Sequence, residues 1–131
     1  MLFLCVRNSA RSQMAEGLLR STAGDRFEAY SAGLEAGAVR PEAVAVMAEI
    51  GVDISGQRSK TAESLAGAPF DLVVTTCDEA KEACPYFPGA REIRHWSFPD
   101  PAAVEGAGRM AAFRDVREGL RERIGELAAE G

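Results

Sequence analysis

Short apolar runs alternate along the chain with segments whose apolar residues recur every three or four positions. Runs at 2–6 and 27–32 predict strands, and a fourth strand is predicted at 92–96. The continuous β-branched run at 70–76 is the strongest strand signal and is typical of a strand buried on both faces of a parallel sheet. The chain therefore carries four predicted strands.

The segments between these strands have helical spacing. One predicted helix follows the first strand after a short loop and reaches Gly24, and a second opens at Pro41 and stops at Gly51. A short helix is predicted at 78–83 and a long amphipathic helix at 103–130. The apolar face of the long helix consists of Met110, Phe113, Val116, Leu120, Ile124 and Leu127.

The order of these elements indicates an α/β fold. Right-handed crossovers between strands and helices give a mostly parallel sheet with helices on both faces. With 131 residues and no repeat or linker, we expect one domain over residues 1–131. Ligands of such sheets bind beyond the carboxyl ends of the strands, which is where Cys5 and Cys77 fall.

Composition narrows the range of partners. Hydrophobic residues make up 47% and charged residues 27% of the chain, as in packed globular proteins. The net charge of −5 argues against nucleic acid or an anionic membrane as a partner, so an anion site has to be local. The apolar runs are far shorter than a membrane span of roughly 20 residues, and the first is too short for a signal peptide. We therefore expect a cytoplasmic protein.

Three cysteines, Cys5, Cys77 and Cys84, cannot all pair within one chain. This number fits a reducing compartment in which the thiols serve chemistry. The chain has no Cys-x2-Cys spacing and a single histidine, so we expect neither a metal site nor another cofactor. The alternative for Cys77 and Cys84 is a pair of buried cysteines in the core.

The segment between the first strand and the first helix has the composition of an oxyanion site. Backbone N–H groups and the dipole at a helix N-terminus favour an anion, and the same field favours the thiolate of Cys5 as a nucleophile. Arg11 offers a planar set of donors to a tetrahedral oxyanion, and Ser12 can donate its hydroxyl to the sulfur. The alternative is a buried cysteine, a helix-capping serine and a surface arginine. The residues expected around the oxyanion are Val6, Arg7, Asn8, Ser9, Ala10, Arg11 and Ser12.

This segment resembles the low-molecular-weight tyrosine phosphatase superfamily. The resemblance is carried by residues 5–17, with the sequence CVRNSARSQMAEG, and by the sequence YSAG at 30–33. The pair Cys77 and Cys84, the sequence FPDP at 98–101 and the sequence GVDIS at 51–55 are similar to thioredoxin-coupled arsenate reductases. The resemblance covers essentially the whole chain and implies a four-stranded parallel sheet flanked by helices.

The resemblance further implies that three cysteines reduce arsenate. Cys5 attacks the arsenic, Cys77 attacks Cys5 and releases arsenite, and Cys84 resolves the bond into a Cys77–Cys84 disulfide that thioredoxin reduces. Phosphate and sulfate are expected to compete as oxyanions. Asp100 is the implied general acid, although an aspartate between two prolines is also an ordinary turn residue.

The spacing of Cys77 and Cys84 adds a prediction. In a helix the two residues would be roughly 10 Å apart, beyond the limit of roughly 7 Å for a disulfide. The segment that contains them therefore has to rearrange when it is oxidised.

Two other functions remain open. A low-molecular-weight protein tyrosine phosphatase would hydrolyse phosphate monoesters through a phosphocysteine. Such enzymes commonly carry tyrosines after Asp-Pro, where this chain has Ala102 and Ala103. A non-enzymatic module that senses anions or binds a partner would need neither a nucleophile nor a relay.

Some reductases of this kind bind potassium beside the loop. The matching positions here include Asn8, Glu16 and Ser31, but Lys60 stands where an acidic residue would be. The tethered ammonium of Lys60 is thus a candidate replacement for the free cation.

Overall fold

The computed structural model describes residues 1–5, 10–33, 37–65, 69–76 and 90–130. Its strands are β1 (Leu2–Cys5), β2 (Tyr30–Gly33), β3 (Val73–Thr75) and β4 (Ile93–His95). Its α-helices are α1 (Arg11–Ala23), α2 (Pro41–Ala48) and α4 (Arg109–Glu130). Three 3-10 helices complete the described elements: η1 (Ala62–Leu65), η2 (Pro101–Ala103) and η3 (Gly106–Gly108).

The four strands form one parallel sheet in the order β2-β1-β3-β4. β1 is a central strand, and its Leu2 pairs with Tyr30 on one side and with Val73 on the other. The expected α/β fold with a four-stranded parallel sheet is confirmed. Since all strands run the same way, their carboxyl ends meet at one edge, and Cys5 ends β1 at that edge.

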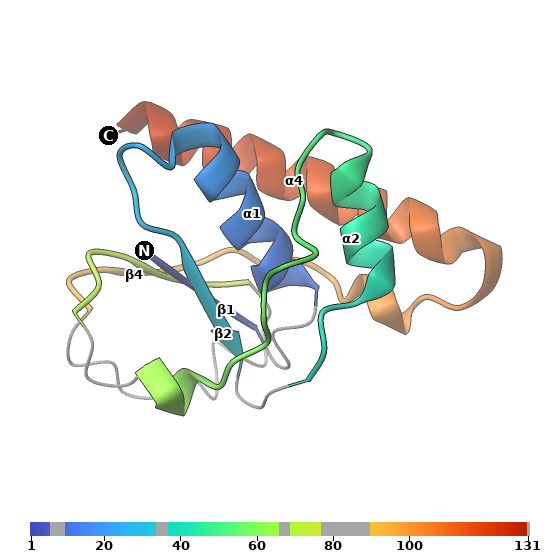
Figure 1. Ribbon diagram of the computed structural model, residues 1–131, viewed down its shortest axis with the longest axis horizontal. Coiled ribbons are helices and arrows are strands. Elements are labelled where there is room, and N and C mark those ends of the chain that lie inside the picture. The colour runs from blue at the N-terminus through green and yellow to red at the C-terminus, as the bar shows by residue number, and fades with distance from the viewer. Residues whose placement is uncertain (6–9, 34–36, 66–68, 77–89, 131) are drawn as a thin grey trace.

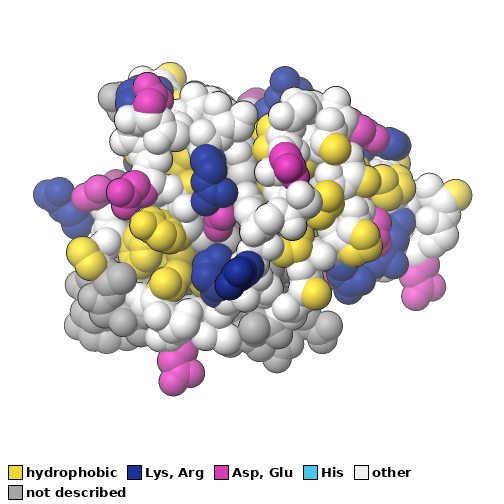
Figure 2. All heavy atoms as spheres, viewed as in Figure 1, with side chains coloured by type: hydrophobic (Ala, Val, Ile, Leu, Met, Phe, Trp, Pro, Cys, Tyr) yellow, Lys and Arg dark blue, Asp and Glu magenta, His cyan; other side chains and the backbone are white. Residues whose placement is uncertain are grey.

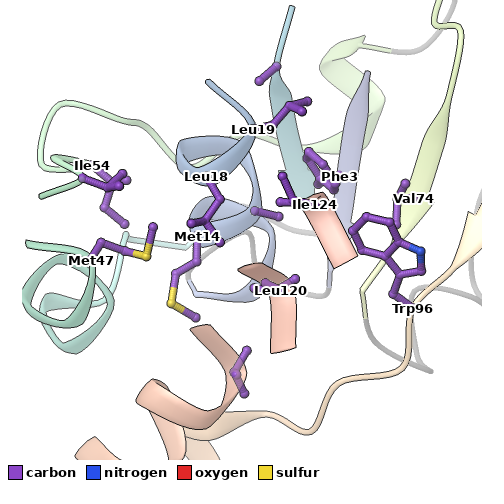
Figure 3. Close-up of a cluster of buried hydrophobic side chains, with 14 of the residues drawn as sticks. Phe3, Met14, Leu18, Leu19, Met47, Ile54, Val74, Trp96, Leu120 and Ile124 are labelled. Atoms are coloured by element: carbon purple, nitrogen blue, oxygen red, sulfur yellow. The ribbon is translucent and has the colours of Figure 1, made fainter. Parts of the chain in front are cut away.

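Helices α1, α2 and α4 lie together on one side of the sheet (Figure 1). The core between them and the sheet contains Phe3 of β1, Met14 of α1 and Met47 of α2, all fully buried (Figure 3). Trp96 closes the core beside β4, with its ring centroid 5.9 Å from that of Phe3. On the other side of the sheet, η1 and Phe70 pack against Leu2 and Leu4, the β1 side chains that point away from the helices.

Several element boundaries differ from the sequence-based expectation. β3 is only three residues long, and Phe70 forms an isolated bridge with Ala90 instead of extending the strand. α4 begins at Arg109, not at 103, because η2 and η3 occupy the interval and Gly106 adopts a φ of 74° that a continuous helix would not allow. The apolar face predicted for the long helix is nevertheless the one that packs in the core.

Candidate active site

The sulfur of Cys5 lies at the N-terminus of α1. Cys5 is 2% exposed, and its Sγ is 2.9 Å from the Oγ of Ser12, which is fully buried. Because Ser12 is the second residue of α1, this hydrogen bond holds the sulfur beside the first turn of the helix. The structure thus brings together the two residues that the sequence paired, and the role of Ser12 toward the sulfur stays a prediction. A negative charge on the sulfur would be stabilised there by the helix dipole.

The start of α1 is built without a side-chain cap in the described residues, because residue 10 is an alanine. The backbone carbonyl of Ala10 accepts the first helical hydrogen bond from the N–H of Met14 at 2.9 Å. A helix N-terminus without a capping side chain keeps N–H donors available for another acceptor. This local arrangement follows from the chain, since β1 ends at Cys5 and α1 begins at Arg11, only six positions later.

Arg11 is directed at the segment that precedes Asp100. Its side chain is largely buried, the residue being 7% exposed, and Nη1 donates a hydrogen bond of 3.1 Å to the carbonyl oxygen of Phe98. The alternative of a surface arginine is therefore wrong. Phe98 was not among the site residues expected from the sequence, and its one signal was its place two residues before Asp100. The contact joins the start of α1, where the oxyanion site is predicted, to the segment that carries Asp100.

Asp100 is exposed and caps a short helix. Its Oδ1 accepts a 3.0 Å hydrogen bond from the backbone N–H of Ala102, so that it starts η2. The ordinary turn role considered for this residue is thus observed. Asp100 also lines an apolar cleft. The cleft is lined by Phe98, Pro99, Asp100, Pro101, Val104, Ala112, Asp115 and Val116.

Helix α1 also carries a buried carboxylate, that of Glu16. Glu16 of α1 accepts hydrogen bonds from the Ser31 hydroxyl at 2.6 Å and from Arg20 at 2.9 Å. The ammonium of Lys60 lies 3.9 Å from the same carboxylate oxygen that Ser31 contacts. Since two cationic side chains already neutralise Glu16, these residues do not fit a potassium ion. In the described ranges, no three His, Cys, Asp or Glu side chains form a metal-binding group.

Six of the predicted site residues lie outside the described residues. They are Val6, Arg7, Asn8, Ser9, Cys77 and Cys84. Their expected roles stay predictions.

The surface carries no dominant charge on the face drawn in Figure 2. Acidic and basic side chains lie next to one another there, and the described residues of that face form no extended basic patch (Figure 2). None of the helices among the described residues combines the length and apolar character needed to cross a bilayer.

Comparison with known proteins places these features in a family. The model of the low molecular weight phosphotyrosine protein phosphatase family matches residues 1–130. A protein of Halalkalibacterium halodurans named arsenate reductase is 47% identical, with 98% of this chain and 94% of that protein covered. The arsenate reductase of Bacillus subtilis is 44% identical over the same shares. A solved structure titled as an arsenate reductase in the phosphate binding state has a TM-score of 0.84 and 37% identity, and covers 98% of this chain and 95% of its own.

Proposed function

Because the chain belongs to the low molecular weight phosphotyrosine protein phosphatase family, we propose that it is an arsenate reductase that works through a thiolate at Cys5. The observation that carries the proposal is the buried hydrogen bond between Cys5 and Ser12 at the N-terminus of α1, beside Arg11. The full-length similarity to proteins named arsenate reductase supports arsenate as the substrate.

In the first step the Cys5 thiolate attacks arsenic. A sulfur–arsenic bond forms, and one oxygen leaves as water after accepting protons. The Ser12 hydroxyl donates to the sulfur before the attack, and the guanidinium of Arg11 binds the remaining arsenate oxygens. Asp100 is the general acid for the departing oxygen, a role that its exposed carboxyl group can fill by exchanging protons with solvent.

The second step moves two electrons from thiols to arsenic. The Cys77 thiolate attacks the Cys5 sulfur and forms a Cys5–Cys77 disulfide. The electron pair of the broken sulfur–arsenic bond stays on arsenic, which leaves as arsenite. Cys84 then attacks Cys77, which frees Cys5 and leaves a Cys77–Cys84 disulfide. The attack by Cys84 is a thiol–disulfide exchange, and the rates of both attacks depend on the thiolate fraction and the access of the attacking cysteine.

Thioredoxin is the proposed reductant of the Cys77–Cys84 disulfide. A dithiol of low reduction potential supplies the two electrons that arsenic has taken up. A cytoplasmic location fits this cycle, because thiols are kept reduced there. Phosphate and sulfate should compete with arsenate, since all three are tetrahedral oxyanions.

The test compares two activities in one set of variants. Arsenite production with thioredoxin and hydrolysis of an aryl phosphate are measured in the wild type, Cys5→Ser, Cys77→Ser and Cys84→Ser. We expect Cys5→Ser to lose both activities, and the other two variants to lose arsenite turnover while keeping hydrolysis. Equal loss of both activities in Cys77→Ser and Cys84→Ser would contradict the relay.

A phosphatase is the second candidate function. It is favoured by the family and by the apolar cleft beside Asp100, where an apolar leaving group could bind while its departing oxygen is protonated. In that case Cys5 would form a phosphocysteine and the relay would be unnecessary. Efficient aryl-phosphate hydrolysis without any arsenite production by the wild type would favour the phosphatase.

A further inference from the structure

A glycine in the middle of α4 makes room for the ring of Phe98. A methyl group placed on Gly119 would lie 2.7 Å from Cε1 of Phe98, and 3.5 and 3.6 Å from two further ring atoms. Carbon atoms that are not bonded do not approach to 2.7 Å without displacement, so the ring occupies space that only glycine leaves open. Glycine in a helix interior is unfavourable by roughly 1 kcal/mol relative to alanine, so its use here is not explained by helix stability.

The backbone of Phe98 connects this contact to Arg11. The Phe98 carbonyl accepts the hydrogen bond from Nη1 of Arg11 at 3.1 Å. Phe98 is followed by Pro99, which restricts the backbone of the residue before it to extended conformations. A displaced ring therefore has few backbone conformations in which the carbonyl still meets Arg11.

The guanidinium of Arg11 has five N–H donors, and the bond to Phe98 uses one of them. We expect the other donors to bind an oxyanion. Because Arg11 is largely buried, the Phe98 carbonyl fixes the direction in which these donors point. An arginine held in place before the ligand arrives binds it more tightly than one that has to be ordered during binding.

We propose that Gly119 and Phe98 are positioning residues: Gly119 of α4 seats the Phe98 ring, and the Phe98 carbonyl aims Arg11 at the oxyanion. The proposal rests on the role of Arg11 in the proposed function. Helix α4, which carries no proposed catalytic residue, thereby determines oxyanion affinity.

The test uses two glycines of the same helix. In Gly119→Ala the added methyl group meets Phe98, whereas in Gly125→Ala it meets no described atom within 4 Å. Both changes raise helix propensity equally, so Gly125→Ala is a matched control. Phosphate affinity is measured as protection of Cys5 from a thiol reagent, in a background with Cys77→Ser and Cys84→Ser.

We expect Gly119→Ala to weaken phosphate binding about three- to tenfold while thermal stability stays near that of the wild type. Gly125→Ala should leave phosphate affinity unchanged and slightly raise stability. In the reductase assay of the enzyme with all three cysteines, Gly119→Ala should raise KM more than it lowers kcat. If Gly119 affected only the stability of the helix, thermal stability would change in both variants and phosphate affinity would change in neither.

A second variant tests the contact itself. Phe98→Leu keeps the carbonyl but removes the ring, so adding Gly119→Ala to it should cause little further loss of phosphate affinity. Full additivity of the two losses would overturn the proposal, as would wild-type affinity in Gly119→Ala or an equal loss in Gly125→Ala. Failure of phosphate to protect wild-type Cys5 would also overturn it.

These outcomes are separable from those of the proposed function. If the wild type produces no arsenite but Gly119→Ala still loses phosphate affinity, the reductase proposal fails and the positioning role stands. If the wild type reduces arsenate and Gly119→Ala binds phosphate normally, the positioning role fails alone.

Discussion

The hydrogen bond between Ser12 and Cys5 can be tested by removing one oxygen atom. In Ser12→Ala, the sulfur loses its partner at 2.9 Å, and both residues are buried, so water does not readily replace the hydroxyl. A hydrogen bond to a charged group contributes about 1.5–3 kcal/mol, which corresponds to a roughly 10- to 150-fold lower fraction of thiolate at low pH. We therefore expect Ser12→Ala to react more slowly under acidic conditions.

The size of the measured effect is smaller than the change in thiolate fraction. A thiolate that is less stabilised is also a better nucleophile, and this gain offsets about 40–50% of the change on a logarithmic scale. The rate of exchange with a small disulfide reagent should therefore fall about 3- to 20-fold at low pH. At high pH, where the thiol is ionised in both proteins, Ser12→Ala should react faster than the wild type.

The assay follows thiol–disulfide exchange with a dipyridyl disulfide from pH 4 to pH 10, with Cys77→Ser and Cys84→Ser present so that only Cys5 reacts. Ser31→Ala is the control, because Ser31 is equally buried but donates its hydroxyl to Glu16. The two rate profiles of wild type and Ser12→Ala should cross. Profiles that coincide, or a crossing that Ser31→Ala also produces, would refute the assignment of Ser12 to the thiolate.

Three further predictions follow from other contacts. Gly17→Ala places a methyl group 2.5 Å from Cγ2 of Ile54. It should lower the free energy of unfolding by about 1–3 kcal/mol in urea titrations. An unchanged midpoint of unfolding would mean that the segment after α2 shifts to accommodate the methyl group. Hydrogen bonds from Arg114 and Arg117 lower the pKa of Glu49 from 4.5 to about 2. Glu49→Gln should therefore lower the free energy of unfolding at pH 7, and its difference from the wild type should shrink as the pH falls from 4.5 through 2. A difference that persists at pH 1.5 would contradict this linkage. Because Lys60 lies beside Glu16, replacing potassium by sodium in the buffer should leave arsenite production by the wild type unchanged. In Lys60→Asp, arsenite production should respond to potassium. A large potassium effect on the wild type would exclude the idea that the Lys60 ammonium replaces a potassium ion.

The parts of the site that are close in the chain were predictable, and those that are distant were not. Cys5, Arg11 and Ser12 lie within one strand–loop–helix unit, so the spacing alone predicted that the sulfur would meet the helix N-terminus. The bond from Arg11 to Phe98 joins residues 87 positions apart, and such a contact depends on how α4 and the sheet pack. No local sequence pattern at Phe98 or Gly119 predicts this contact.

The fold shows the same division between local and distant effects. The hydrophobic pattern predicted the four strands and the apolar face of α4 because each is a repeat within one element. It misplaced the start of α4, since turns that begin at Pro101 and continue to Gly108 interrupt a pattern of apolar spacing that looks continuous. The order β2-β1-β3-β4 follows from packing rather than from any single segment.

The central place of β1 in the sheet has a consequence for synthesis of the protein. β1 leaves the ribosome before its neighbour β3, and well before the Phe98 carbonyl that accepts a hydrogen bond from Arg11. Under the proposed function, the nascent polypeptide therefore carries Cys5 before Phe98 can position Arg11. Incomplete chains, released early, should bind oxyanions poorly beside Cys5.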